Sequence, residues 1–395
     1  MNRSTITFPS HAEQQDLRDA VRSLCSQFPL EYWDDCDSES RFPEEFYQAF
    51  AQAGFLSVLI PEEYGGSGGT MTQMAAILEE VAAGGGALNA NSSVHIPLLT
   101  VPTLLKFGTE EQKKDLLSKI ANGELYVTFG VTEPDAGTDT TSISTRATKV
   151  DGGWKVNGQK VWNSGALRGD KVLTLVRTGT PEPGGKKGEG LTLLLIDLKQ
   201  DDVEIRPIRK IGRHAVASCE VVFTDVFVPD SDVVGSVGQG FYHLLYSLNG
   251  ERLLLSAGAI GIGRWAVQAA VEYGKERVVF GHQIGRHQSV QHPLSKAYLE
   301  LLAASEVLSR ALAEYEEKGG RAIGTLANGV KYLATEAEFA ATDAAMQTFG
   351  GYSFAREYHV GRHWIESRLQ RIAPINNQMV LNSIAETALG LPRSY

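Results

Sequence analysis

The period of the hydrophobic pattern changes twice along the chain, and this change limits the folds that its 395 residues can adopt. Between about residues 11 and 120, apolar side chains such as Leu17 and Val21 recur at steps of three and four, which predicts amphipathic helices. Between residues 126 and 237 the period is two, which predicts β-strands. The helical period returns from residue 239 onward. A β domain between two helical ones is therefore expected, in an α+β protein of several domains.

The expected domain boundaries lie where the period changes. We predict an N-terminal α-helical domain over residues 1–124, a middle antiparallel β domain over 125–237 and a C-terminal α-helical domain over 238–395. The C-terminal domain contains long Ala- and Leu-rich stretches with little loop between them, which favours a four-helix bundle.

Composition excludes several classes of function. The net charge is −10 and no basic stripe with interleaved aromatic residues is present, which argues against nucleic acid as a partner. The first thirty residues hold no uninterrupted apolar segment, so we expect no membrane anchor and a cytoplasmic protein. The histidines at 282, 287 and 292 recur at five-residue steps that spread them around a helix, and no metal site is expected.

Residues 129–139 predict a binding site at the end of a strand. An alternating apolar strand stops at Glu133 and Pro134, and a turn of small residues follows from Asp135 to Asp139. The free backbone N–H groups and hydroxyls of such a turn can hold a planar, polar ligand. An ordinary exit from a strand into a loop has the same composition, and this stretch by itself leaves both interpretations open.

Several separated blocks resemble the signature blocks of the acyl-CoA dehydrogenases, and the resemblance covers essentially the whole chain. The blocks are Val131-Thr132-Glu133-Pro134-Asp135-Ala136-Gly137-Thr138-Asp139, Asn157-Gly158-x-Lys160-x-Trp162, Arg277-Val278-Val279-Phe280-Gly281 with Gln288, and Gln347-x-Phe349-Gly350-Gly351-Tyr352. This resemblance implies the acyl-CoA dehydrogenase fold, FAD as cofactor and an acyl-CoA as substrate. It further implies a product trans-2-enoyl-CoA, an electron-transfer flavoprotein as electron acceptor, a homotetramer or homodimer, and a place in fatty acid metabolism.

The resemblance also assigns residues to the flavin. An isoalloxazine ring needs an apolar wall and a hydrogen-bonding edge with donors near N5. The family usually shows Trp-Ile-Thr in the second block, where this chain has Trp162-Asn163-Ser164, and serine keeps the hydroxyl group. The expected residues are Phe129, Val131 and Thr132 at the edge, Thr138 beside the dinucleotide and the substrate, and Trp162 with Ser164 at the wall and N5.

A second set of expected cofactor residues comes from a neighbouring subunit in relatives. Arg277 suits the pyrophosphate because its guanidinium is a fork of donors, and Phe280 suits the adenosine side. The remaining members of the set are Gln288, Gln347, Gly350 and Gly351. Oligomerisation is therefore implied.

The catalytic base of most relatives is a glutamate near the C-terminus, but Pro374 occupies that position here. Relatives of the isovaleryl and long-chain types carry the base on the long helix that opens the C-terminal domain, where this chain has Glu251 followed by Arg252. The resemblance thus assigns Glu251 as base, and Arg252 and His95 as substrate contacts. Gly250 suggests that room is needed for a ligand. A solvated or Arg-paired helical glutamate is the alternative interpretation of Glu251.

Other chemistries on the same fold remain alternatives. Because the common base is missing, a flavin monooxygenase, a desulfinase or an acyl-carrier-protein dehydrogenase is the second hypothesis, and a flavin-binding scaffold without activity is the third. Glu251 separates them, since monooxygenation and desulfination need no base for an α proton at that position.

Overall fold

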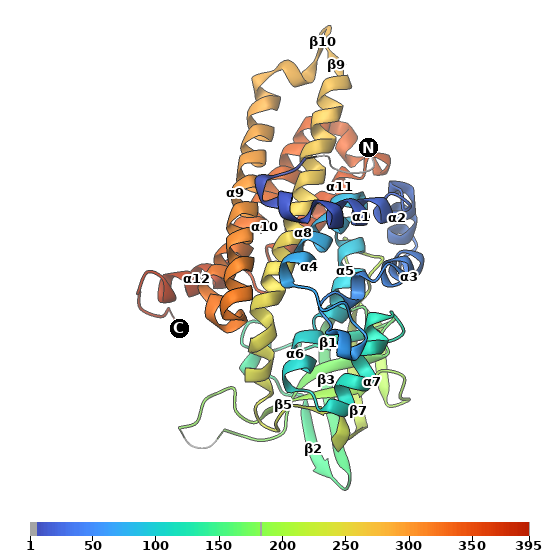
Figure 1. Ribbon diagram of the computed structural model, residues 1–395, viewed down its shortest axis with the longest axis vertical. Coiled ribbons are helices and arrows are strands. Elements are labelled where there is room, and N and C mark those ends of the chain that lie inside the picture. Colours follow the sequence, from blue (N-terminus) through green and yellow to red (C-terminus); the bar gives the residue numbers. More distant parts are fainter. Residues whose placement is uncertain (1–5, 182–183, 395) are drawn as a thin grey trace.

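The computed structural model describes residues 6–181 and 184–394, and it places a sheet at one end of a long set of helices (Figure 1). The N-terminal helices are α1 (Gln15–Cys25), α2 (Leu30–Ser38), α3 (Glu44–Gln52), α4 (Met71–Val81), α5 (Ala87–Leu98), α6 (Val101–Phe107) and α7 (Glu110–Ala121), with a short 3-10 helix η1 (Pro9–Gln14) before them. Thr70 and Thr109 begin α4 and α7, and each accepts a hydrogen bond from the backbone N–H three residues on.

Three consecutive glycines at 84–86 have the composition of a helix end, but they do not end α4 in a loop. They form a single π-helical turn over Ala82–Gly86, in which Gly85 takes a φ of +94°, and the chain continues directly into α5. The Arg362 guanidinium donates to the carbonyls of Gly85 at 2.8 Å and Gly86 at 3.2 Å, which replaces helical hydrogen bonds lost at the turn. Sequence analysis therefore missed α5, which proves central to the site.

The sheet has the strand order β6-β7-β3-β2-β4-β5-β8, and β1 pairs with β4 outside this path. The strands are β1 (Val127–Gly130), β2 (Arg146–Val150), β3 (Gly153–Ser164), β4 (Lys171–Arg177), β5 (Leu191–Asp197), β6 (Val203–Pro207), β7 (Ser218–Pro229) and β8 (Val233–Val234). The expected antiparallel pattern holds for most of the ladder, but β1 and β2 both pair with β4 in parallel. Asn157 and Gly158 have the composition of a hairpin turn, but they lie inside β3 at a register shift.

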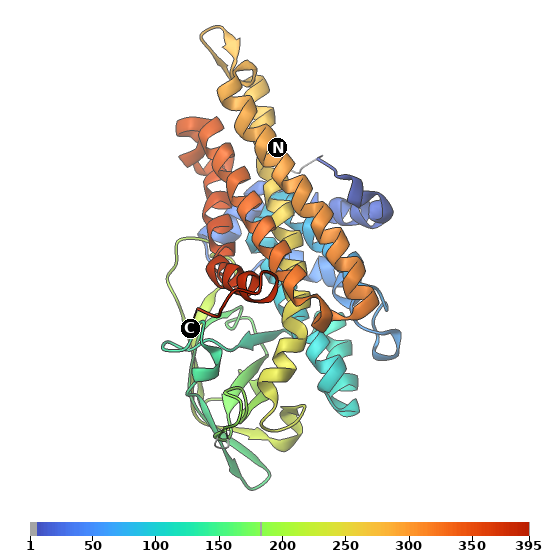
Figure 2. The ribbon, with the colours of Figure 1, turned by 90° about the vertical axis from the view of Figure 1, so that its left-hand side faces the viewer.

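The C-terminal bundle is built on α8 (Gly240–Glu276), α9 (Gln288–Lys318) and α10 (Gly324–Phe349). The single last helix that the sequence suggests is two helices, α11 (Val360–Gln370) and α12 (Asn377–Thr387), with Pro374 between them. A small hairpin of β9 (Val278–Val279) and β10 (His282–Gln283) joins α8 to α9 at the end of the molecule opposite the sheet (Figures 1 and 2).

Helix α8 is the centre of the protein. It packs against α4, α9 and α10, and glycines allow the closest approaches: a Cβ on Gly261 would lie 2.1 Å from the Glu79 carbonyl oxygen of α4. Among the described residues α8 is long and apolar enough to cross a membrane, yet 83% of its apolar window is buried within the protein. This burial is typical of the core helix of a globular fold.

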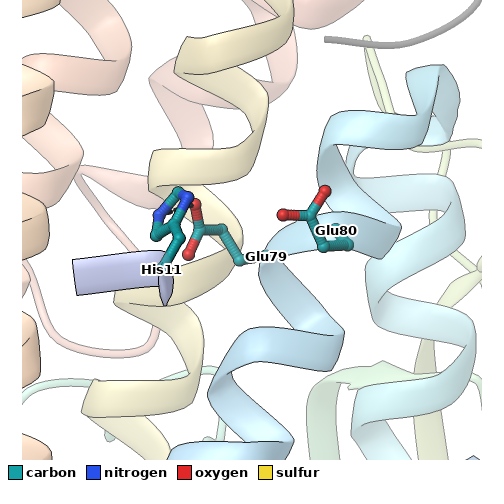
Figure 3. Close-up of side chains that lie close together, drawn as sticks. All are labelled: His11, Glu79 and Glu80. Atoms are coloured by element: carbon teal, nitrogen blue, oxygen red, sulfur yellow. Dashed lines mark ion pairs between the residues drawn. The ribbon is translucent and has the colours of Figure 1, made fainter. Parts of the chain in front are cut away.

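A buried cluster of charged side chains joins the two helical regions (Figure 3). Its members are His11, Arg18, Arg22, Glu79, Glu80 and Arg264, from η1, α1, α4 and α8. Arg264 Nη1 lies 2.6 Å from Glu79 Oε1 and 3.0 Å from Glu80 Oε1. Burial alone would raise the pKa of Glu79, but the arginines hold that pKa well below its ordinary value.

The same cluster contains three groups at a spacing that a metal ion could use. Ligand atoms of His11, Glu79 and Glu80 all lie within 4.8 Å of one another. Arg18, Arg22 and Arg264 already supply three positive charges to the two carboxylates, so a further cation would meet net repulsion. We therefore interpret the cluster as an ion network that fixes α1, α4 and α8 together.

Candidate active site

The exit of β1 is held rigidly by a buried ion pair that the sequence analysis did not single out. Lys160 Nζ on β3 donates to Glu133 Oε1 at 2.7 Å and to the Val131 carbonyl at 3.1 Å. Glu133 also accepts from the backbone N–H groups of Ser144 and Thr145. Burial would raise the pKa of Glu133, but Lys160 and these donors hold it at about 2.

The residues predicted to hydrogen-bond the edge of a flavin ring lie next to the Glu133–Lys160 ion pair. Phe129, Val131 and Thr132 are partly buried along the end of β1, and the Thr132 carbonyl accepts from the Val161 N–H of β3 at 2.9 Å. Thr138, which the sequence also assigns to the site, is exposed in the loop beyond. The end of β1 and the turn after it, residues 129–139, thus form a rigid platform that presents exposed polar groups.

Trp162 supplies an open, flat apolar surface beside that edge. It adopts a φ of +63° at a register shift between β3 and β7, and 56% of its surface is exposed. A left-handed conformation is costly for a bulky side chain and is found mainly where function requires it. Ser164 follows two residues later and is partly buried. An exposed indole held in a strained backbone next to a hydroxyl fits a planar ring such as a flavin.

Helix α5 connects this platform to α8. It contacts both β1 and α8, and Ser92 of α5 accepts a hydrogen bond at 3.3 Å from Arg213, which also donates to Ser164. His95 lies one turn further along α5 and is 9% exposed. Burial lowers the pKa of His95 to about 4, so the imidazole is neutral, and its Nε2 has no hydrogen-bond partner within the described residues. A neutral ring with an unused nitrogen can serve a bound substrate.

Glu251 lies on α8 and is partly buried. Burial raises the pKa of Glu251 to about 7, and the charge of Arg252 opposes this rise only in part. Within the part of the chain that the structure describes, the carboxyl group makes no hydrogen bond or ion pair. The Arg252 guanidinium donates to Asn249 Oδ1 instead. The geometry therefore does not support an Arg-paired helical glutamate, and it leaves a free carboxyl with the pKa that a general base requires.

Gly250 has a packing role in the structure. A Cβ at this position would lie 3.2 Å from Met71 Cε and 3.3 Å from the ring of Tyr315. The missing side chain thus allows α8 to pack against α4 and α9. The expectation that it makes room for a ligand stays a prediction.

Two other glutamates of the C-terminal helices, Glu366 and Glu386, are occupied or exposed. Glu366 is 1% exposed and accepts hydrogen bonds from the Leu88 N–H at 2.7 Å and from Asn89 Nδ2 at 3.1 Å, so it caps the first turn of α5. Burial raises the pKa of Glu366 to about 7 as well, but its oxygens are engaged. Glu386 is exposed on α12. Glu251 remains the best-placed candidate.

The second predicted set of cofactor residues lies at the other end of the molecule. Arg277 and Phe280 belong to the β9–β10 hairpin, which Figure 1 shows far from the sheet, and Phe280 is 96% exposed at a φ of +52°. The Arg277 guanidinium lies over the Tyr352 ring at 5.7 Å. The other members are also exposed: Gln288, Gln347, Gly350 and Gly351. The two predicted sets of cofactor residues therefore lie far apart in one chain, and the second set is exposed.

Arg213 is the residue beside Ser164 that sequence reasoning missed. It carries no motif, and the signal in the sequence is a run of basic residues shortly before the apolar strand β7: Arg206, Arg209, Lys210 and Arg213. The glutamate and lysine of the Glu133–Lys160 pair were quoted as parts of blocks, but their contact across 27 positions could not be read from their spacing.

An open indole and a hydroxyl on the sheet, with a free carboxyl of raised pKa on a helix of the same fold, suit a flavin-dependent oxidoreductase. Comparison with known proteins gives the particular family. Sequence profiles of the acyl-CoA dehydrogenase N-terminal, middle and C-terminal domains match residues 11–124, 128–226 and 238–389. The chain belongs to the acyl-CoA dehydrogenase family, as the resemblance predicted.

Individual relatives agree over their whole length. Acyl-CoA dehydrogenase fadE12 of Mycobacterium bovis is 36% identical over 389 residues, which cover 98% of this chain and 99% of that one. A glutaryl-coenzyme A dehydrogenase solved with glutaryl-CoA has a TM-score of 0.91 and 29% identity, over 98% of both chains. The FAD complex of PigA has a TM-score of 0.89 and 26% identity, over 98% of this chain and 100% of that one.

Proposed function

We propose that this protein oxidises an acyl-CoA thioester to the trans-2-enoyl-CoA with FAD as cofactor and Glu251 as base. The observation that carries the proposal is the Glu251 carboxyl, which is unpaired among the described residues and has its pKa raised to about 7 by burial. A carboxylate of this basicity can remove the α proton of a thioester, which an ordinary glutamate would do poorly.

Different residues of the chain hold the cofactor, remove the proton and contact the substrate in this proposal. Bound FAD would supply the acceptor for the hydride of the β carbon. Trp162 would hold its ring on one face, and the polar groups of Val131, Thr132 and Ser164 would hold its edge. Glu251 takes the α proton and holds it. Burial between α4, α5 and α8 excludes water, and the neutral His95 is placed to contact the acyl group.

The partners follow from the same proposal. Arg277, Phe280, Gln288, Gln347, Gly350 and Gly351 complete the cofactor site of a neighbouring copy in a homotetramer or homodimer, because they face outward and away from their own sheet. Electrons pass to an electron-transfer flavoprotein, in the cytoplasm and in the metabolism of fatty acids. Arg252 and Thr138 are proposed to contact the substrate. Monooxygenase and desulfinase chemistry would leave the raised pKa of Glu251 without a use.

Anaerobic mixing with acyl-CoAs tests the proposed reaction. We expect the yellow absorbance of the purified protein to bleach with at least one member of a panel of straight, branched and aromatic acyl-CoAs, with the enoyl-CoA as product. The same acyl groups on an acyl carrier protein form the comparison arm. If every thioester leaves the flavin oxidised under argon, the proposed function is wrong.

The rate of bleaching should depend on pH in a defined direction. Because burial raises the pKa of Glu251 to about 7, the group is protonated and inactive as a base below that pH. We expect the stopped-flow rate to rise about tenfold per pH unit below pH 6 and to level off above pH 8. A rate that is flat over this range, or a midpoint near the ordinary glutamate pKa of about 4.3, would contradict the assignment.

A further inference from the structure

Arg213 binds three serine hydroxyls at the point where the sheet meets the N-terminal helices. Its Nη2 donates to Ser164 Oγ at 2.7 Å and to Ser218 Oγ at 2.9 Å, and its Nη1 donates to Ser92 Oγ at 3.3 Å. These serines belong to β3, β7 and α5. Arg213 adopts a φ of +55°, a conformation that a non-glycine residue keeps only where its surroundings require it.

The charge of this guanidinium is not matched by a neighbouring carboxylate. Within the described residues Arg213 makes no ion pair, and its Nε is buried without a hydrogen-bond partner. The nearest acidic influence is Glu366, whose oxygens are already engaged by Leu88 and Asn89. An arginine cannot deprotonate in a protein, so the site keeps a positive charge that an added anion would neutralise.

Lys210 is a second basic side chain close to Arg213. Lys210 Nζ donates to Ser218 Oγ at 3.1 Å, the same hydroxyl that Arg213 binds, and to the Val216 carbonyl at 2.7 Å. Burial and the charge of Arg213 lower the pKa of Lys210 to about 7. Arg213 is therefore the permanent charge of the pair, and the region beside Ser164 is electropositive.

The hydrogen bond from Arg213 also determines what Ser164 can offer. A hydroxyl has one proton and two acceptor lone pairs. The guanidinium has no lone pair to accept with, so Ser164 is the acceptor in this contact and its own proton is free to point elsewhere. A donor that accepts from a cation is polarised and becomes a stronger donor toward a third group.

We propose that Arg213 is a positioning residue that orients and polarises the Ser164 hydroxyl toward the flavin and balances the negative charge of the reduced cofactor. This inference depends on the proposed function only in that FAD lies against Trp162 and Ser164. Its consequence is that Arg213 favours the reduced over the oxidised flavin. The arginine does not touch the reacting atoms and acts through the serine.

A redox titration of the flavin tests the proposal without any substrate. We expect Arg213→Gln to lower the equilibrium ratio of reduced to oxidised flavin about tenfold at a fixed potential, which is about 30 mV for a two-electron couple. Arg206→Gln is the matched control, because Arg206 is an exposed arginine of the same domain paired with Glu204, and its loss changes the total charge equally. We expect that control to leave the potential unchanged.

Two more variants show whether Arg213 acts through Ser164. Ser164→Ala should lower the ratio by a similar factor, and adding Arg213→Gln to it should have less effect than in the native background, since neighbours in one network are not additive. Arg213→Lys keeps the charge but loses the fork, and its potential should lie between those of the native protein and Arg213→Gln. It also serves as the folding control if Arg213→Gln loses flavin.

The outcomes separate this inference from the proposed reaction. Native potentials in Arg213→Gln and Arg213→Lys, with flavin bound, would overturn the role of Arg213 even if acyl-CoA still bleaches the protein. Full additivity with Ser164→Ala would also overturn it. A lowered potential in a protein that no acyl-CoA reduces would support Arg213 and reject the proposed reaction.

Discussion

Glu251→Gln is expected to bind FAD normally and to lose bleaching by acyl-CoA about 1,000-fold, because glutamine keeps the shape of the side chain but cannot accept a proton. The expected loss is large since Glu366 is engaged as the cap of α5 and Pro374 occupies the place of the usual base. Stopped-flow measurement of flavin absorbance under argon, with the acyl-CoA found by the panel, gives the rate directly.

Two controls make this result specific. Glu272→Gln makes the same chemical change on the same helix, where Glu272 accepts from Gln268, and should leave the rate unchanged. Glu251→Asp keeps a carboxylate at a different distance and should retain a larger part of the rate than the glutamine variant. Retained bleaching in Glu251→Gln, with flavin bound, would remove Glu251 as the base.

Arg277→Ala is expected to weaken retention of FAD about 100-fold, because it removes a charge-assisted donor to the pyrophosphate. The affected flavin should be the one held by the neighbouring chain, because Arg277 and the sheet lie at opposite ends of the molecule (Figure 1). Flavin content after gel filtration, measured by the ratio of visible to ultraviolet absorbance, reports the loss.

Mixed oligomers give the stronger test of shared sites. In a particle that contains one Glu251→Gln chain and one Arg277→Ala chain, one site receives its base from the second chain and its arginine from the first, and is therefore intact. Random pairing of differently tagged chains should restore about a quarter of native activity. Each variant alone forms the control. No recovery in purified mixed particles would show that both sets of cofactor residues serve the same chain.

The hydrophobic period was sufficient to predict the layout of helices and sheet, because it depends on side chains that are local in sequence. It failed where a distant residue decides the local structure. Gly84 to Gly86 read as a helix end, but Arg362 satisfies the freed carbonyls and lets the chain continue into α5. Asn157 and Gly158 have the composition of a hairpin turn, but the close approach of Thr145 makes glycine necessary within a strand.

The candidate site likewise combines features that the sequence predicts with features that only the assembled fold determines. Family blocks point to Trp162, Ser164 and Glu251, but composition does not reveal that the Trp162 backbone is left-handed or that the Glu251 carboxyl is unpaired among the described residues. The packing role of Gly250 could not be predicted because its neighbours Met71 and Tyr315 are far away in the sequence. Arg213 was missed because its partners lie on three other elements. Its importance is a property of the assembled fold.

The ion network of Glu79, Glu80 and Arg264 has a consequence for the order in which the chain can mature. Arg18 and Arg22 precede the two glutamates in the chain, but Arg264 is synthesised about 185 residues after them, and the buried network is incomplete until that arginine arrives. We therefore expect the first helical region to reach its final packing only after α8 is synthesised, although its sequence profile ends at residue 124. Nascent chains halted before residue 264 should remain sensitive to protease in α4, and chains extended past α8 should not. What alignment treats as separate domains would then mature as one unit, completed by its central helix.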